Sequence, residues 1–98
     1  MAAETAGIAR ALAELKEKAI QEYRAEIVGV FGSYARGEQK AGSDVDVLVN
    51  FLPGATLFDL VGLAELLEDR LKLRVDIVPV DTLRAEIREQ VLKEAIRL

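Results

Sequence analysis

The chain has 98 residues, of which 51% are hydrophobic and 31% charged, and its formal net charge is −4. A chain of this length is expected to fold as one domain, and its acidic balance argues against a nucleic-acid backbone as the main partner. Cysteine and histidine are absent, which excludes disulfides, zinc sites and histidine acid–base catalysis. The remaining carboxylates, hydroxyls, Lys and Arg suit hard, oxygen-preferring ions such as Mg²⁺.

The N-terminal residues lack the basic, apolar and small-residue pattern of a secretory signal, and no apolar stretch is long enough for a membrane span. The composition also leaves no low-complexity or disordered segment. We therefore expect a cytoplasmic protein that has no membrane partner.

Hydrophobic periodicity predicts the elements in chain order. They are a helix over residues 5–24, a strand over 26–31, a helical turn over 34–37, a strand over 44–51, a helix over 57–71, a strand over 73–80 and a final helix capped by Asp81. Pro79 is expected at a strand end or a sheet edge, and the final helix is expected to cover the sheet. The order α-β-(short α)-β-α-β-α predicts an α/β (α+β) domain with a small mixed β-sheet flanked by helices.

The first predicted strand ends in Gly32 and Ser33. A residue without Cβ followed by a capping hydroxyl lets the backbone approach a bulky anion, and the free N–H groups of a following helical turn would favour phosphate. Arg36 and Lys40 lie close in sequence and could neutralise phosphate oxygens. A Gly-Ser pair alone is more often a plain turn with solvated cations nearby.

Asp44 and Asp46 begin the second predicted strand. Two residues apart on a strand, both carboxylates project from one face, about 7 Å apart along the backbone. Close carboxylates repel each other, and a divalent cation removes that repulsion. A calcium-binding EF-hand loop is excluded, because Val47 and the apolar residues after it replace the Asp, Asn and Gly that such a loop requires.

Asp76 interrupts the apolar third strand, where a charge is costly unless it is paired or metal-bound. A parallel crossover through the helix over residues 57–71 would set this strand beside the one with Asp44 and Asp46. Asp76 is therefore either a third metal ligand or a strand-end acid paired with Arg74 or Lys72.

The segment GSYARGEQKAGSDVD, from Gly32 to Asp46, resembles the signature of the DNA polymerase β-like nucleotidyltransferase superfamily, Gly-Ser, ten residues, then Asp-x-Asp. GSYARGE and SDVDVLV are especially similar to its smallest branch, the minimal nucleotidyltransferases. The resemblance runs from Ile27 to the final helix. It implies a polymerase β-like nucleotidyltransferase fold, with residues 1–98 forming one nucleotidyltransferase domain.

The resemblance also implies roles for individual residues. Gly32 and Ser33 would hold the β- and γ-phosphates of a nucleoside triphosphate, with support from Arg36. Asp44 and Asp46 would ligate two Mg²⁺ ions. Asp76 would complete the acceptor-side metal site and accept the acceptor's proton. The reaction would be in-line attack on the α-phosphorus with departure of pyrophosphate.

A chain of 98 residues leaves no room for the acceptor-binding domains of larger relatives, so we expect another molecule to supply the acceptor. Minimal nucleotidyltransferases of this kind resemble antitoxins paired with a helical HEPN-domain toxin ribonuclease, which they silence by transferring AMP to a tyrosine hydroxyl. The leading hypothesis is therefore adenylyl transfer from ATP to such a toxin.

Three other functions stay open. The chain could inhibit a toxin by association alone and keep the metal site as a nucleotide sensor. It could modify a small molecule, as the resembling aminoglycoside-modifying enzymes do, although no acceptor domain is expected. It could also be a purely structural domain, in which case the arrangement of Asp44, Asp46 and Asp76 would be a coincidence.

Overall fold

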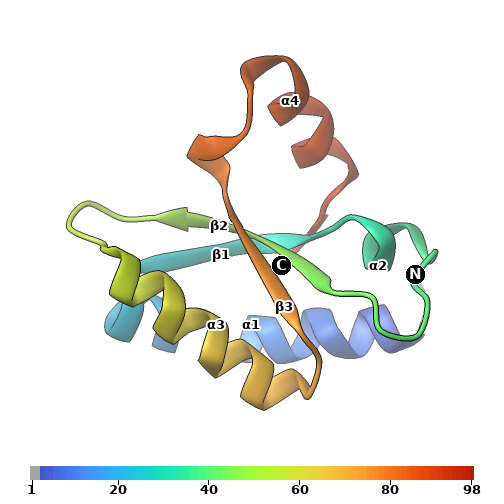
Figure 1. The fold of residues 1–98 in the computed structure, drawn as a ribbon, viewed down its shortest axis with the longest axis horizontal. Coiled ribbons are helices and arrows are strands. Elements are labelled where there is room, and N and C mark those ends of the chain that lie inside the picture. The colour runs from blue at the N-terminus through green and yellow to red at the C-terminus, as the bar shows by residue number, and fades with distance from the viewer. Residues whose placement is uncertain (1–2) are drawn as a thin grey trace.

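The computed structural model describes residues 3–98, and its elements follow the predicted order closely (Figure 1). They are α1 (Ala3–Tyr23), β1 (Ala25–Phe31), α2 (Ser33–Arg36), β2 (Val45–Phe51), α3 (Leu57–Leu71), β3 (Val75–Pro79), the 3-10 turn η1 (Val80–Thr82), α4 (Ala85–Glu94) and β4 (Ile96–Arg97). The helix over residues 57–71 is confirmed at both ends. Its start is fixed because the N–H of Thr56 donates to Asp59 Oδ2 at 2.8 Å, as in a capping box.

The strands form one mixed sheet in the order β3-β2-β1-β4. β1 pairs antiparallel with β2 and with β4, whereas β2 and β3 run parallel. The crossover through α3 therefore places β3 beside β2, as predicted. Pro79 is the last residue of β3, which is an edge strand, so its missing N–H costs no bond inside the sheet.

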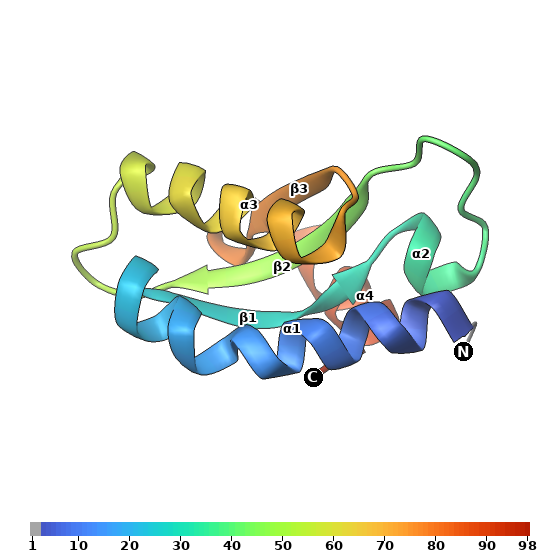
Figure 2. The same ribbon diagram turned by 90° about the horizontal axis from the view of Figure 1, so that it is seen from below.

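The core lies on one face of the sheet, under α1 and α3 (Figure 2). Val45, Val47 and Val49 alternate along β2 and are fully buried there, together with Leu12 of α1 and Leu67 of α3. Because successive side chains of a strand point to opposite faces, Asp46 of β2 projects from the face that these helices leave uncovered. Among the residues described, no helix is long and apolar enough to cross a membrane.

The C-terminal end differs from the prediction in two respects. Asp81 does not cap the final helix, because residues 80–82 close a 3-10 turn in which the N–H of Leu83 donates to the carbonyl of Val80 at 3.1 Å. Arg84 is the N-cap, and α4 begins only at Ala85. The strand β4, which is two residues long and returns the chain to β1, was not predicted.

The last helix lies on the opposite side of the sheet from α1 and α3 (Figures 1 and 2). It carries no fully buried residue. It therefore covers the sheet less completely than its apolar periodicity predicts.

Candidate active site

The Gly-Ser turn adopts the predicted helical conformation. Gly32 has φ +74° and ψ −149°, and α2 follows from Ser33 to Arg36 before Gly37 ends it in the left-handed conformation. Backbone N–H groups of Arg36 and Glu38 donate to the carbonyls of Gly32 and Ser33 at 3.1 and 2.9 Å. The first N–H groups of such a turn have no partner within it, so they can receive an anion.

Gly32 lies directly against the carboxylate of Asp46. The two strands place Phe31 opposite Asp46, and a Cβ on Gly32 would lie 2.2 Å from Asp46 Oδ2. No larger residue fits between the turn and the acid. From the sequence Gly32 was assigned to phosphate contact alone, whereas it also makes room for Asp46.

Asp46 and Asp76 face each other across the parallel pair of strands. They are direct register partners on neighbouring strands, so their side chains project from the same face of the sheet. Partial burial, then the negative charges of Asp76 and Asp44, raises the pKa of Asp46 above its ordinary value of 3.8. The structure thus brings these two acids together, and the positive charge of Arg36 offsets only part of the effect of burial and repulsion.

Asp44 lies one residue before β2 and takes a different position. Its Oδ1 is 3.4 Å from Nε of Arg74, and about half of its side chain is exposed. Arg74 therefore pairs with Asp44 and not with Asp76, while Lys72 pairs with Asp69 at 3.4 Å. Within residues 3–98, no three acidic side chains converge as a preformed metal site, so Asp44 would have to move toward Asp46 and Asp76 to act as a third ligand.

The predicted phosphate-binding cations both extend toward solvent. Nε of Arg36 lies 2.6 Å from Oε1 of Glu38, and that contact is the main cause of its raised pKa, with further contributions from the charges of Glu94 and Asp46. Arg36 thus lies within the field of the acidic site. The backbone N–H of Lys40 donates to Ser43 Oγ, and its ammonium makes no ion pair with any described residue.

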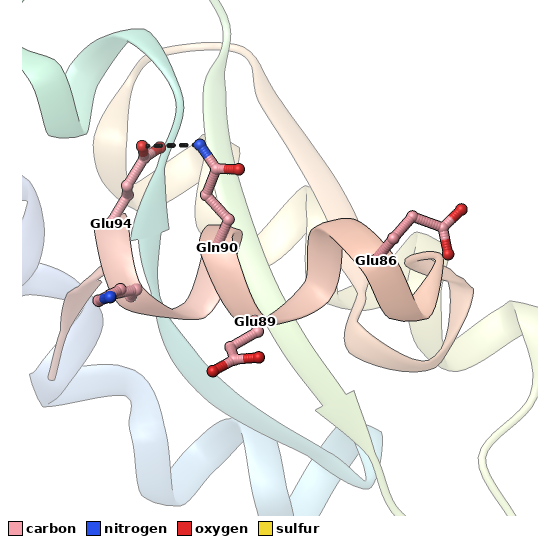
Figure 3. Close-up of a pocket in the computed structure, with 5 residues that line it drawn as sticks. Glu86, Glu89, Gln90 and Glu94 are labelled. Carbon is pink, nitrogen blue, oxygen red and sulfur yellow. Dashed lines mark hydrogen bonds between the residues drawn. The ribbon is translucent and has the colours of Figure 1, made fainter.

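A separate hollow of about 480 Å³ lies along α4 (Figure 3). Its lining residues are Glu86, Glu89, Gln90, Lys93 and Glu94. Gln90 Nε2 donates to Glu94 Oε1 at 3.4 Å across one side of it. Neither the Gly-Ser turn nor the three aspartates line this hollow, so it is distinct from the candidate site.

The raised pKa of Asp46 predicts that, with divalent cations chelated, stability falls as pH rises. The unfolded carboxyl keeps a value near 3.8, so between that value and the raised folded one the native state binds more protons than the unfolded state. The free energy of unfolding therefore decreases with pH across that window. Urea unfolding from about pH 4 to pH 7 should show this decrease in the wild type and a weaker one in Asp46→Asn; parallel curves would contradict it.

Comparisons with known proteins agree with this geometry. The family model described as nucleotidyltransferase domain matches residues 8–98. The protein adenylyltransferase MntA of Thermococcus cleftensis is 42% identical over 81 residues, which span 83% of this chain and 82% of that protein. A solved structure described as a candidate minimal nucleotidyltransferase is 47% identical, with a TM-score of 0.77 and 91% of each chain covered.

A crystal structure of a toxin-antitoxin with AMP-PNP is 24% identical, with a TM-score of 0.64, over 83% of this chain and 67% of that one. This last likeness is one of fold alone. The chain belongs to the nucleotidyltransferase domain family, as a minimal nucleotidyltransferase of the DNA polymerase β-like superfamily. The predicted enzyme class and fold are confirmed, whereas the roles of the individual site residues remain predictions.

Proposed function

We propose that this protein transfers AMP from ATP to a hydroxyl of a partner protein. The observation that supports this most directly is the contact of Asp46 with two features at once, the Gly32 turn on one side and Asp76 on the other. An anion-binding turn and a pair of acids therefore share one face of the sheet. The relative from Thermococcus cleftensis, which is named a protein adenylyltransferase, aligns with most of this chain.

The proposed reaction is in-line displacement at the α-phosphorus of ATP. The hydroxyl oxygen of the acceptor forms a bond to the α-phosphorus, the bond from that phosphorus to the bridging oxygen breaks, and pyrophosphate leaves. The turn at Gly32 and Ser33, with Arg36, binds the β- and γ-phosphates that become the leaving group. Asp76 accepts the hydroxyl proton, because the protein offers carboxylates and no histidine as bases.

The acids also fit a divalent cation. Asp46 and Asp76 supply the hard oxygen ligands that Mg²⁺ prefers. A bound cation would also offset the burial and the repulsion by Asp76 and Asp44 that raise the pKa of Asp46. Asp44 would join them by exchanging Arg74 for the metal. When bound, up to two Mg²⁺ ions would neutralise phosphate charge and acidify the acceptor hydroxyl.

The proposed acceptor is a HEPN-domain toxin, so this chain would be the antitoxin of the pair. Support comes from two neighbours of the same fold, a toxin-antitoxin with AMP-PNP and a mutant of the toxin-antitoxin MntA-HpeT. Both are under 25% identical to this chain, so they support the fold and suggest the biological setting.

Label transfer tests this proposal. The HEPN-domain protein should acquire label from ATP carrying ³²P at the α-phosphate when this chain and Mg²⁺ are present. ATP labelled at the γ-phosphate should leave it unlabelled, because that phosphate departs with pyrophosphate. EDTA should reduce transfer to background, and intact-mass analysis of the co-expressed partner should show added adenylyl groups.

Two other outcomes would replace the proposal. Inhibition of the toxin without label in either experiment would favour a binding module that senses nucleotide. Label recovered in a small molecule and absent from protein would favour a small-molecule acceptor.

A further inference from the structure

Thr5, in the first turn of α1, is fully buried, and apart from Tyr34 with its phenol it is the one buried side chain among the residues described that carries a polar group. Its hydroxyl donates a hydrogen bond of 2.8 Å to the backbone carbonyl of Tyr34, 29 positions further along the chain. Tyr34 belongs to α2, the turn that follows Gly32. A buried hydroxyl that bonds to a distant backbone group fixes the position of that group.

The turn that receives this bond has little intrinsic stability. α2 is four residues long, far shorter than a helix that is stable alone in water. The carbonyl of Tyr34 accepts one other hydrogen bond within the turn, from the N–H of Gly37, and this bond is long at 3.4 Å. The Thr5 hydroxyl is therefore the stronger of the two constraints on that carbonyl.

The start of α1 reaches the same segment at a second point. Gln39 Nε2 donates to Glu4 Oε2 at 3.4 Å. Tyr34 within the turn and Gln39 just after it therefore contact two consecutive residues of α1. In Figure 2 the N-terminal end of α1 lies beside α2. The first turn of α1 thus holds the Gly-Ser turn from its core side.

We propose that Thr5 is a positioning residue for nucleotide binding, one that holds the backbone of the Gly-Ser turn in the conformation that receives phosphate. This inference rests on the proposed function, since it assumes that the turn binds a nucleotide. Without the hydroxyl, the turn populates the competent conformation for a smaller fraction of the time, and the apparent dissociation constant rises by the inverse of that fraction.

The test uses Thr5→Val, which keeps the shape of the side chain and removes the hydroxyl. Binding of AMP-PNP with Mg²⁺ should weaken about three- to tenfold, the range that one hydrogen bond supports. At saturating ATP, kcat for labelling the partner should fall less than about twofold, because the full turn is then ordered by the ligand. Hydrogen exchange at the backbone amides of residues 36–38 should be faster without nucleotide.

Two matched variants separate positioning from stability. Thr5→Ser keeps the hydroxyl and loses a methyl group, so it should bind AMP-PNP with nearly wild-type affinity even though the protein is less stable. Ile8→Val removes a methyl group from the same core face of α1 and should change neither affinity nor exchange at residues 36–38. Urea unfolding of each variant gives the stability against which affinity is compared.

Three results would overturn the inference. They are equal AMP-PNP affinity in Thr5→Val and wild type, unchanged amide exchange in Thr5→Val, and equally weak binding in Thr5→Val and Thr5→Ser. If wild-type protein binds no AMP-PNP, the proposed function fails, and the nucleotide role of Thr5 fails with it. If the wild type binds AMP-PNP and Thr5→Val binds it equally well, the proposed function stands and only the positioning role of Thr5 fails.

Discussion

Asp46→Asn should lose adenylyl transfer by at least about a thousandfold while the fold is kept. Asp46 contacts the Gly32 turn and faces Asp76, so in the proposed reaction its charge would serve both the phosphate side and the acceptor side of the site. The substitution removes a carboxylate whose pKa is raised by burial and by neighbouring acids. At neutral pH the free energy of unfolding should therefore stay equal or increase, measured by urea denaturation with EDTA.

Asp69→Asn is the matched control for this experiment. Asp69 lies near the end of α3, is 86% exposed and pairs with Lys72. Its removal should leave both transfer and stability close to wild type, because an exposed pair contributes little. A variant of Asp46 that loses activity and stability together would indicate that this acid is structural, which would contradict its proposed role.

The opposition of activity and stability at one residue is a general mark of a catalytic site. A charge that repels its neighbours in the folded protein is retained only where it serves something else. The ion pairs at the rim of the site follow the same logic. Arg74 pairs with Asp44 and Glu38 pairs with Arg36, so each of these two groups has a protein partner that its proposed ligand would replace.

Much of the fold could be predicted because local signals and pairing rules agree. Thr56 and Asp59 cap α3, and this helix begins and ends where its apolar periodicity predicts. The right-handed crossover rule placed β3 parallel to β2. The predicted cap at Asp81 was wrong because this residue lies in a 3-10 turn before the helix. The strand β4 was missed because two residues are too few to show a hydrophobic period.

The site was less predictable, because its decisive contacts join distant residues. The alternation of β2 correctly placed Asp46 on the face opposite Val45 and Val47, but the pairing of Asp44 with Arg74 depends on where β3 begins. The contact of Gly32 with Asp46 depends on strand register, which the sequence alone did not specify. The bond from Thr5 to Tyr34 spans 29 positions and carries no local signal.

Gly32→Ala is expected to have the second large effect, because two independent requirements for glycine coincide there. The residue has φ +74° and ψ −149°, a region that is essentially restricted to glycine and costs an L-amino acid about 1–3 kcal/mol. Its new Cβ would also lie 2.2 Å from Asp46 Oδ2, 3.1 Å from its Cγ and 3.4 Å from its Cβ. The carboxylate must therefore move, and a displacement of about 1 Å at a reacting centre can cost about a hundredfold in rate.

Gly42→Ala separates these two requirements. Gly42 has φ +86°, but nothing lies within 4 Å of the position that a Cβ would take there, so alanine incurs the backbone strain without the collision. Both variants should therefore lose about 1–3 kcal/mol from backbone strain in urea denaturation, with a further loss in Gly32→Ala from the collision, while adenylyl transfer falls about a hundredfold or more in Gly32→Ala alone. Equal activities in the two variants would mean that Asp46 tolerates displacement, which is incompatible with a carboxylate that holds the reacting groups in place.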